Sequence, residues 1–191
     1  MRVFLAILLD PPLRDALCAC VRALQAADPP ARLKWVGDEQ HHLTLHFLGE
    51  ISPTQVEAVT RALAAIPPPV APLSLTLGGL GAFPSLSRPA TLWAGGKDAG
   101  GGIAARTAEY GRALKTLGFE IDSRPFTPHL TLARVPRDLD PVALREVGAW
   151  FAVRQALAPL PLTQAVRAIH LMRSELLPSG ARYTPVASFS Q

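Results

Sequence analysis

The sequence contains one tetrapeptide twice, His-Leu-Thr-Leu at residues 42–45 and again at residues 129–132. The copies are 87 positions apart, close to half of the 191-residue chain, and only five histidines are present, so a chance duplicate is very unlikely. We interpret the tetrapeptide as the mark of an internal repeat. The chain is therefore expected to fold as two related halves, joined about an approximate two-fold axis that brings both copies to one cleft.

Each copy of the tetrapeptide has the pattern of a half-buried strand. Side chains alternate between the two faces of a strand, so His42 and Thr44 are expected on one face and the two leucines on the other. The same alternation places His129 and Thr131 together. The leucines would anchor each strand, and the cleft would hold two imidazoles and two hydroxyls.

The hydrophobic pattern predicts an α+β fold with antiparallel sheets, because its strands alternate in polarity instead of forming continuous apolar runs. Residues 78–84 are expected to form a turn-rich exit from a strand, and residues 95–102, with five glycines, a flexible loop. The expected strands are 2–9, 32–36, 42–48, 73–77, 90–94, 129–135, 165–173 and 181–189, and the expected helices are 11–28, 52–66, 103–117 and 141–151.

Composition limits the class of protein. With 49% hydrophobic and 18% charged residues the chain is globular, and its length suits a single domain over residues 1–191. The longest apolar run, residues 3–9, is too short for a membrane span and is expected to be a buried first strand and not a signal peptide. Cys18 and Cys20 are expected to be reduced core thiols in a cytoplasmic protein, which we expect to be a monomer without a membrane partner.

Two histidines and two hydroxyls suit phosphoester chemistry. A neutral imidazole can take a proton from attacking water, and a protonated one can give a proton to the leaving oxygen. Hydroxyls can donate to the non-bridging oxygens of the phosphate. The 19 basic against 15 acidic residues, with a sequence pI near 9.6, favour an anionic partner without choosing one.

The sequence resembles the two-histidine (2H) phosphoesterases and, among them, the RNA 2′,3′-cyclic phosphodiesterases also called 2′-5′ RNA ligases. The resemblance covers nearly the whole chain and rests on segments that match in the expected order. These are Met1-Arg2-Val3-Phe4-Leu5-Ala6-Ile7, the two tetrapeptides with Phe47-Leu48-Gly49 after the first and Arg124-Pro125-Phe126-Thr127-Pro128 before the second, Gly79-Leu80-Gly81-Ala82-Phe83-Pro84, Leu92-Trp93-Ala94-Gly95, Ala133-Arg134 and Ser174-Glu175-Leu176.

The resemblance implies a bilobal α+β fold, with two pseudo-two-fold-related lobes of antiparallel sheet and outer helices around a central cleft. It implies that His42 is the proton donor, that His129 is the proton acceptor, and that Thr44 and Thr131 bind the substrate phosphate. The implied substrate is RNA with a 2′,3′-cyclic phosphate end, or a cyclic nucleotide, hydrolysed to a 2′-phosphate. No metal and no cofactor are implied, and any 2′-5′ ligation would be reversal of the cyclic-ester reaction.

Several other residues near the motifs have open roles. In a regular strand His46 would share a face with His42 and is expected to contact substrate or to be solvated. His41 points to the opposite face and His170 has no partner motif, so both are expected to be structural. Arg134 is expected to face away from His129 unless the strand bends. The aromatic residues Phe47, Phe83 and Phe126 suit base stacking and the core equally.

Two other functions fit the same residues. A metal-dependent phosphohydrolase would use the histidines as ligands, although the sequence has no His-Glu-x-x-His motif and no zinc-spaced cysteine pair. A binding module without turnover would hold a nucleotide or an RNA end in the cleft. ATP-dependent ligation is disfavoured, because there is no Walker-type phosphate loop.

Overall fold

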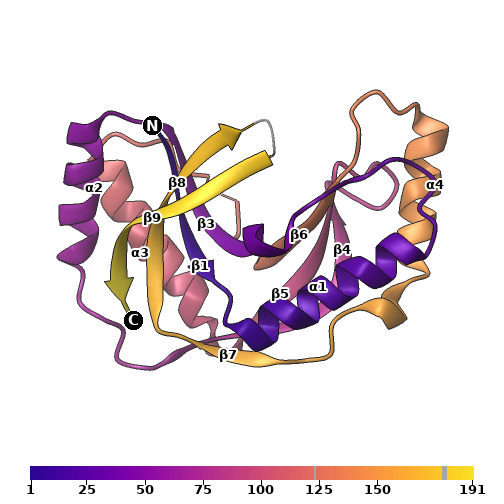
Figure 1. Cartoon of the computed structure of the whole chain (residues 1–191). Helices are drawn as coiled ribbons and strands as arrows, with labels where there is room; N and C mark the ends of the chain where they lie inside the picture. The colour runs from indigo at the N-terminus through magenta and orange to yellow at the C-terminus, as the bar shows by residue number, and fades with distance from the viewer. Residues whose placement is uncertain (123, 178–179) are drawn as a thin grey trace.

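The computed structural model describes residues 1–122, 124–177 and 180–191, which form a single curled antiparallel sheet with helices on its outer side (Figure 1). The strand order is β7-β4-β5-β6-β3-β1-β8-β9, and β2 pairs with β6. The strands are β1 (Arg2–Leu8), β2 (Lys34–Trp35), β3 (His42–Glu50), β4 (Leu73–Phe83), β5 (Thr91–Asp98), β6 (His129–Arg134), β7 (Thr163–Val166), β8 (Ala168–Leu177) and β9 (Gly180–Ser190). The helices are α1 (Pro11–Ala26), α2 (Pro53–Ala64), α3 (Gly102–Thr116) and α4 (Pro141–Ala152), with short 3₁₀ turns η1 (Asp38–Gln40), η2 (Ala99–Gly101) and η3 (Gln155–Leu157).

The two halves of the sheet meet where the repeated tetrapeptides pair. Strands β3 and β6 are antiparallel neighbours, and Leu43 lies opposite Leu130. These leucines occupy the same place in the two copies of the repeat. Two equivalent residues that pair with each other in antiparallel strands lie next to a local two-fold axis. The expectation of a two-fold-related, bilobal α+β fold is therefore confirmed.

Each lobe has its own layer of helices and its own apolar core. The first lobe comprises β1, β3, β8 and β9, covered by α2 and α3, and its core includes Leu5, Leu43 and Tyr110. The second lobe comprises β2, β4, β5, β6 and β7, covered by α1 and α4, and its core includes Leu17 and Leu130. Figure 1 shows the two helical layers at opposite outer sides, so the sheet faces inward between the lobes.

The chain crosses between the lobes several times. Helix α1 follows β1 of the first lobe but packs its buried face in the second core, whereas α3 follows β5 of the second lobe and packs in the first core. The last crossing comes at Arg167, between β7, which pairs with β4, and β8, which pairs with β1. These exchanges tie the two lobes together.

Three sequence predictions about strand boundaries were wrong, and in each case the partner strands decide the outcome: the first two involve glycine-rich sequence, and the third involves a chain that leaves β4 for β1 at Arg167. Residues 78–84 belong mostly to β4, and residues 95–98 continue β5 before η2 and the first turn of α3. Residues 165–173, predicted as one strand, are divided between β7 and β8. Glycine-rich sequence has a low intrinsic strand propensity, but β4 and β5 pair along most of their length, and this pairing outweighs the local preference.

The predictions about the thiols and the first strand hold. Cys18 and Cys20 are buried and free, and β1 is buried from Val3 to Ile7. Within the described residues, no helix has the length and apolar character needed to cross a membrane.

Candidate active site

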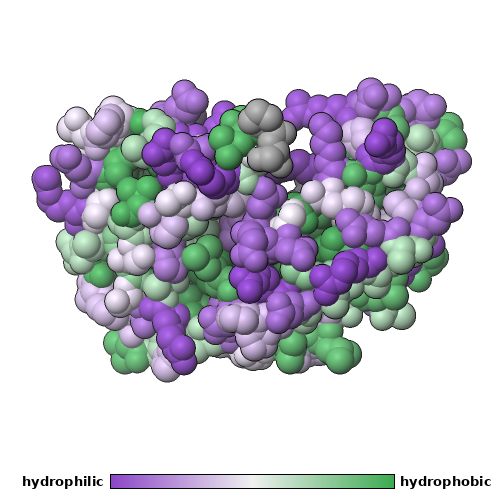
Figure 2. Space-filling model, viewed as in Figure 1, coloured by the Kyte–Doolittle hydropathy of each residue, from purple (hydrophilic) through white to green (hydrophobic). Residues whose placement is uncertain are grey.

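The repeated histidines and threonines lie on the inner face of the sheet. In both tetrapeptides the leucines are fully buried or nearly so in the helix-covered cores, and the alternating His42, Thr44, His129 and Thr131 are half-buried on the other face. Figure 2 shows that the molecule is notched between the lobes, with hydrophilic residues beside the notch. The structure thus brings together the four residues that the sequence singled out.

The pairing of β3 with β6 sets how these side chains face one another. Leu43 is opposite Leu130, so the neighbouring positions place His42 opposite Thr131 and Thr44 opposite His129. Side chains directly opposite in antiparallel strands have Cβ atoms about 4.5–5.5 Å apart. Each histidine is therefore a cross-strand neighbour of the hydroxyl from the other repeat, and neither half of the chain supplies the complete set.

Both histidines are held by the same backbone hydrogen bond. Nδ1 of His42 lies 2.7 Å from the carbonyl oxygen of Gln40, and Nδ1 of His129 lies 2.7 Å from that of Thr127. A carbonyl oxygen can only accept, so Nδ1 carries the proton and donates it in each bond. The Nε2 atom is left to gain or lose a proton, as a general acid or base requires.

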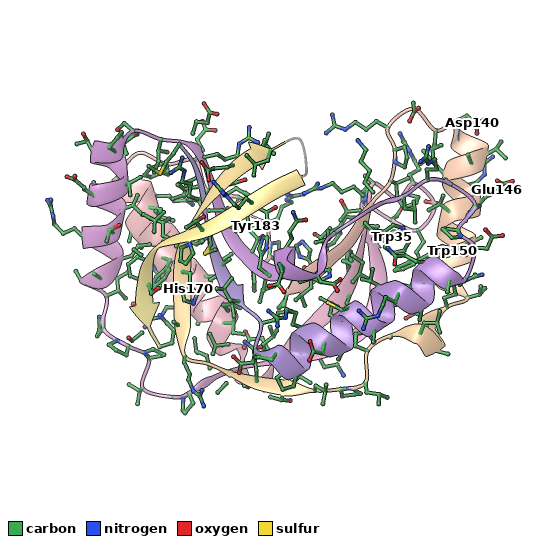
Figure 3. All side chains as sticks on the ribbon, in the orientation of Figure 1. Trp35, Asp140, Glu146, Trp150, His170 and Tyr183 are labelled. Carbon is green, nitrogen blue, oxygen red and sulfur yellow. The ribbon has the colours of Figure 1, made fainter. Side chains whose placement is uncertain are left out.

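Each imidazole is also framed by two aromatic rings. The His42 ring centroid is 4.8 Å from that of Phe4 and 5.0 Å from that of Tyr183, which meets it edge-on. His129 lies 4.8 Å from Phe83, again edge-on, and 6.4 Å from Trp93. Figure 3 labels Tyr183 on β9 at the inner side of the first lobe. These rings limit the rotation of both imidazoles, so Nε2 keeps its direction.

Trp93 reaches His129 because the strand beside it carries a glycine. A Cβ atom built on Gly81 would lie 2.2 Å from the Trp93 indole, too close for any side chain. Gly81 and Trp93 are cross-strand partners in β4 and β5. The glycine is thus required for the aromatic frame of His129.

A β-bulge follows the threonine in each tetrapeptide. On β3, Thr44 pairs with Ala6 and His46 pairs with Leu5, so Leu45 is an extra residue. On β6, Thr131 pairs with Trp93 and Ala133 with Leu92, so Leu132 is the extra residue. The bulges occupy equivalent places in the repeat and reverse the facing of the residues that directly follow them.

The bulge on β3 corrects the prediction for His46. This residue was expected to contact substrate or to be solvated, but it is turned into the first core, where it is 9% exposed. Its Nε2–H donates to the carbonyl oxygen of Thr107 on α3 at 2.8 Å. A Cβ atom at Gly111 would lie only 3.2 Å from the ring, so α3 is closely fitted to it. His46 holds α3 to the sheet and does not face the site.

The same bulges bring to the site face two residues whose roles the sequence left open. Arg134 pairs with Thr91 beyond the bulge on β6 and therefore shares a face with His129 and Thr131, which is the strand bend that the sequence left open. Phe47 pairs with Phe4, with ring centroids 5.7 Å apart, and is 65% exposed. The apolar doublet Leu132-Ala133 interrupts the alternation of β6 and was the available sequence signal for a bulge.

The remaining histidines and phenylalanines divide between core and surface. His170 is a half-buried residue whose Nδ1 lies 2.8 Å from Ser188 Oγ, and Figure 3 shows it on the first lobe. Phe83 adjoins His129, and Phe126 packs against the first core. His41 is buried at 5% exposure. The structural role expected for His170 is consistent with its hydrogen bond.

Burial lowers the pKa of the His42 imidazole. Desolvation is the largest cause, the backbone of Gln40 raises the pKa to a smaller extent, and His41 lowers it. The neutral imidazole is therefore favoured when no anion is bound. A phosphate in the site would act in the opposite direction, because a nearby negative charge favours the protonated ring.

Replacing His46 with alanine tests its structural position. We expect His46→Ala to lower the free energy of unfolding by about 2–4 kcal/mol, because it leaves a cavity and removes the hydrogen bond from the His46 ring to the Thr107 carbonyl oxygen. Because burial lowers the pKa of His46 below its usual 6.5, the unfolded chain binds the proton more readily, and His46 destabilises the fold as the pH falls below 6.5. Urea unfolding at two pH values measures both effects.

The same variant should leave the chemistry nearly intact. We expect the turnover of folded His46→Ala on a phosphodiester substrate to change less than about 3-fold, because the side chain faces away from the site. A loss of turnover as large as that of His42→Ala, with unchanged stability, would show that His46 belongs to the site after all.

Comparisons with known proteins agree with the repeat and the fold. The description "LigT like Phosphoesterase" fits residues 7–93 and again residues 97–183, one match for each half of the chain. A relative from Archaeoglobus fulgidus named "RNA 2′,3′-cyclic phosphodiesterase" is 30% identical over 99% of both chains. One of that name from Geobacillus stearothermophilus is 39% identical, but that match spans 60% of this chain and only 37% of the relative.

A solved structure has the same architecture. The crystal structure of E. coli LigT complexed with 3′-AMP superposes with a TM-score of 0.74, covers 99% of this chain and 97% of that one, and is 25% identical. The two family matches together cover nearly all of the chain, and the paired strands at its centre carry the repeated tetrapeptides. The chain belongs to the LigT-like phosphoesterase family of the 2H superfamily.

Proposed function

We propose that this protein is an RNA 2′,3′-cyclic phosphodiesterase that hydrolyses a terminal 2′,3′-cyclic phosphate to a 2′-phosphate. The observation that carries the proposal is the pair of imidazoles, one from each repeat, held by identical Nδ1 hydrogen bonds beside two threonine hydroxyls. The names of the relatives from Archaeoglobus and Geobacillus support the substrate. The complex of E. coli LigT with 3′-AMP supports a ribonucleotide at this site.

The proposed reaction needs one base and one acid. Nε2 of His129 takes a proton from water as the water oxygen attacks phosphorus. The bond between phosphorus and the 3′-oxygen then breaks, and Nε2–H of His42 gives its proton to that oxygen. The product is a 2′-phosphate with a free 3′-hydroxyl, and the histidines have exchanged protonation states. Assigning His42 as the acid and His129 as the base rests on the family resemblance.

Thr44, Thr131 and Arg134 are proposed to hold the phosphate. Their side chains share the face of the two imidazoles, and the hydroxyls can donate to the non-bridging oxygens. A guanidinium offers several donors and a permanent positive charge to the same oxygens. We also propose that the exposed ring of Phe47 stacks on the base next to the cyclic phosphate.

Removing one hydroxyl should have a moderate effect. We expect Thr131→Val to lower kcat/KM about 10-fold to 100-fold, because valine keeps the shape of the side chain but donates no hydrogen bond. Thr163→Val is a suitable control, since Thr163 is an exposed strand residue of β7, which pairs with neither β3 nor β6. Steady-state hydrolysis of a short cyclic-phosphate RNA gives both values. Equal, small effects of the two substitutions would remove Thr131 from the proposed site.

The pH profile should show both histidines. We expect kcat/KM to be bell-shaped, because only the protein that carries one proton on the two imidazoles has both an acid and a base. The acidic limb reports the lower of the two apparent pKa values of the pair, so it should lie below 6.5, because burial lowers the pKa of His42 in the free protein. In the profile of kcat both limbs should move to higher pH, because the bound phosphodiester anion favours protonated imidazole. A profile that is flat between pH 5 and 9, with chemistry as the slow step, would contradict the mechanism.

The proposed function is tested with an RNA oligonucleotide ending in a 2′,3′-cyclic phosphate, incubated with the protein in excess EDTA. We expect turnover to a 2′-phosphate and no 3′-phosphate. Turnover that EDTA abolishes would favour a metal-dependent phosphohydrolase instead. Tight binding without turnover would favour a binding module. Adding an RNA with a 5′-hydroxyl end in the same experiment tests the reverse joining reaction.

A further inference from the structure

A second group of reactive side chains lies where helix α1 meets the start of β3. It consists of Cys18 on α1, Asp38 in η1 and His41, the residue before β3. One ligand atom from each residue, the thiol sulfur, a carboxylate oxygen and a ring nitrogen, lies within 4.8 Å of the other two. None of the three has a part in the proposed hydrolysis.

His41 is the unusual member of the group. It is 5% exposed, and no described residue forms a well-aligned hydrogen bond with either ring nitrogen, although the Thr131 backbone lies near the ring. The other four histidines each have a ring nitrogen bonded to an oxygen. Leaving a buried polar group unpaired is costly, so the His41 imidazole needs a partner that the described residues do not supply, and a bound cation is one that its nitrogen lone pair could meet.

The three donor types match one class of ion. Thiolate sulfur, imidazole nitrogen and carboxylate oxygen are the ligands of zinc, and three protein ligands leave a fourth position for water. In a tetrahedral site with bonds of about 2.0–2.3 Å, ligand atoms lie about 3.3–3.8 Å apart, so closing this group requires movements of about 1 Å. The Asp38 side chain is 60% exposed, which gives the group an open side toward solvent.

The protonation states also suit a metal ion. Desolvation lowers the pKa of His41, so its imidazole is neutral and has a free electron pair near neutral pH. Burial, followed by the charge of Asp38, raises the pKa of the Cys18 thiol, so this group carries its proton when no cation is bound. A metal cation reverses that preference, because the thiolate is the form that coordinates.

We propose that Cys18 Sγ, an Asp38 carboxylate oxygen and a ring nitrogen of His41 form a binding site for one Zn²⁺ or similar transition-metal ion. On binding, the metal–sulfur bond forms, the S–H bond of Cys18 breaks, and the proton goes to solvent. Water occupies the fourth position. The ion would join α1 to the segment that leads into His42, whose Nδ1 donates to the neighbouring Gln40 carbonyl.

The test uses Co²⁺ as an optical probe, because cobalt bound to thiolate has a charge-transfer absorption in the near ultraviolet. The metal-free protein is titrated with Co²⁺, and Zn²⁺ is then added. We expect one Co²⁺ per chain, the thiolate band, and loss of the band with Zn²⁺. Absence of the band in the wild-type protein would overturn the proposal.

Substitutions identify the ligands. Cys18→Ser should abolish the thiolate band, whereas Cys20→Ser, a control for a second buried thiol on the same helix, should leave it unchanged. Asp38→Asn and His41→Phe should each weaken Zn²⁺ binding about 10-fold to 100-fold. The same band in Cys18→Ser, or its loss in Cys20→Ser alone, would contradict the assignment. Near-ultraviolet circular dichroism establishes that each variant is folded.

Two exposed positions keep the proposal testable if the buried variants do not fold. Asp38→Asn alters a solvent-exposed carboxylate, and unchanged Zn²⁺ affinity in this variant would count against the site. Arg22 lies 3.5 Å from the Asp38 carboxylate and competes with the ion for it, so Arg22→Gln should tighten Zn²⁺ binding. The proposed hydrolysis uses none of these three ligands and is assayed in EDTA, so each proposal can fail without the other.

Discussion

Replacing either repeated histidine with alanine is expected to lower kcat at least about 10²-fold, because each proton transfer in the proposed reaction contributes about 10²–10⁴ to the rate. His42→Ala and His129→Ala each remove the Nε2 that would give or take a proton. Both side chains are half-buried on the inner face of the sheet, outside the two apolar cores, so the variants should remain folded. Single-turnover hydrolysis of a cyclic-phosphate RNA measures the effect.

His170→Ala is the matched control for this prediction. His170 is also half-buried, lies on β8, which β1 separates from β3, and has its Nδ1 next to Ser188 Oγ. We expect its removal to change kcat less than about 3-fold. If His170→Ala were as slow as His42→Ala, or if His129→Ala kept most of its activity, the pairing of the two repeated histidines would not explain the chemistry.

Replacing Arg134 with alanine is expected to produce the second large loss, about 10²-fold in kcat/KM. The bulge at Leu132 brings Arg134 to the face of His129 and Thr131, where its charge would offset the developing charge on the phosphate oxygens. Arg134→Lys should recover part of the loss, because lysine keeps the charge but not the planar fork of donors. Steady-state kinetics at low and moderate salt measure both variants.

Arg145 provides a charge-matched control for Arg134. It is an exposed residue of α4 on the outer side of the second lobe, so Arg145→Ala changes the net charge equally but leaves the site unaltered. We expect less than about a 3-fold change in kcat/KM for this variant. Similar losses for Arg134→Ala and Arg145→Ala would indicate a general electrostatic effect on the RNA and not a phosphate contact.

The central features of the molecule could be predicted from the sequence because they depend on short-range patterns. The duplicated tetrapeptide predicted two related halves and the convergence of His42, Thr44, His129 and Thr131. Alternating apolar residues predicted the strands that carry them. Leu43 and Leu130, which occupy the same position in the two copies of the repeat, pair with each other in the structure.

The features that could not be predicted depend on pairing between distant segments. The bulges at Leu45 and Leu132 are defined by the partners of β3 and β6, which are β1 and β5, and these bulges decide that His46 is buried and that Arg134 faces the site. The glycine-rich end of β4 is a strand because β5 pairs with it. Apart from the apolar doublet Leu132-Ala133, which marks the bulge on β6, the local sequence does not contain this information.

The central claim is that the two halves of the chain supply one acid–base pair acting on a single phosphodiester. It is tested most directly by single-turnover hydrolysis, in EDTA, of a cyclic-phosphate RNA by four proteins: wild type, His42→Ala, His129→Ala and the double variant. Residues that act as a unit have strongly non-additive effects, so the double variant should be about as slow as the slower single variant. If the two losses multiplied in the double variant, the histidines would act independently, and the account given for the site would be wrong.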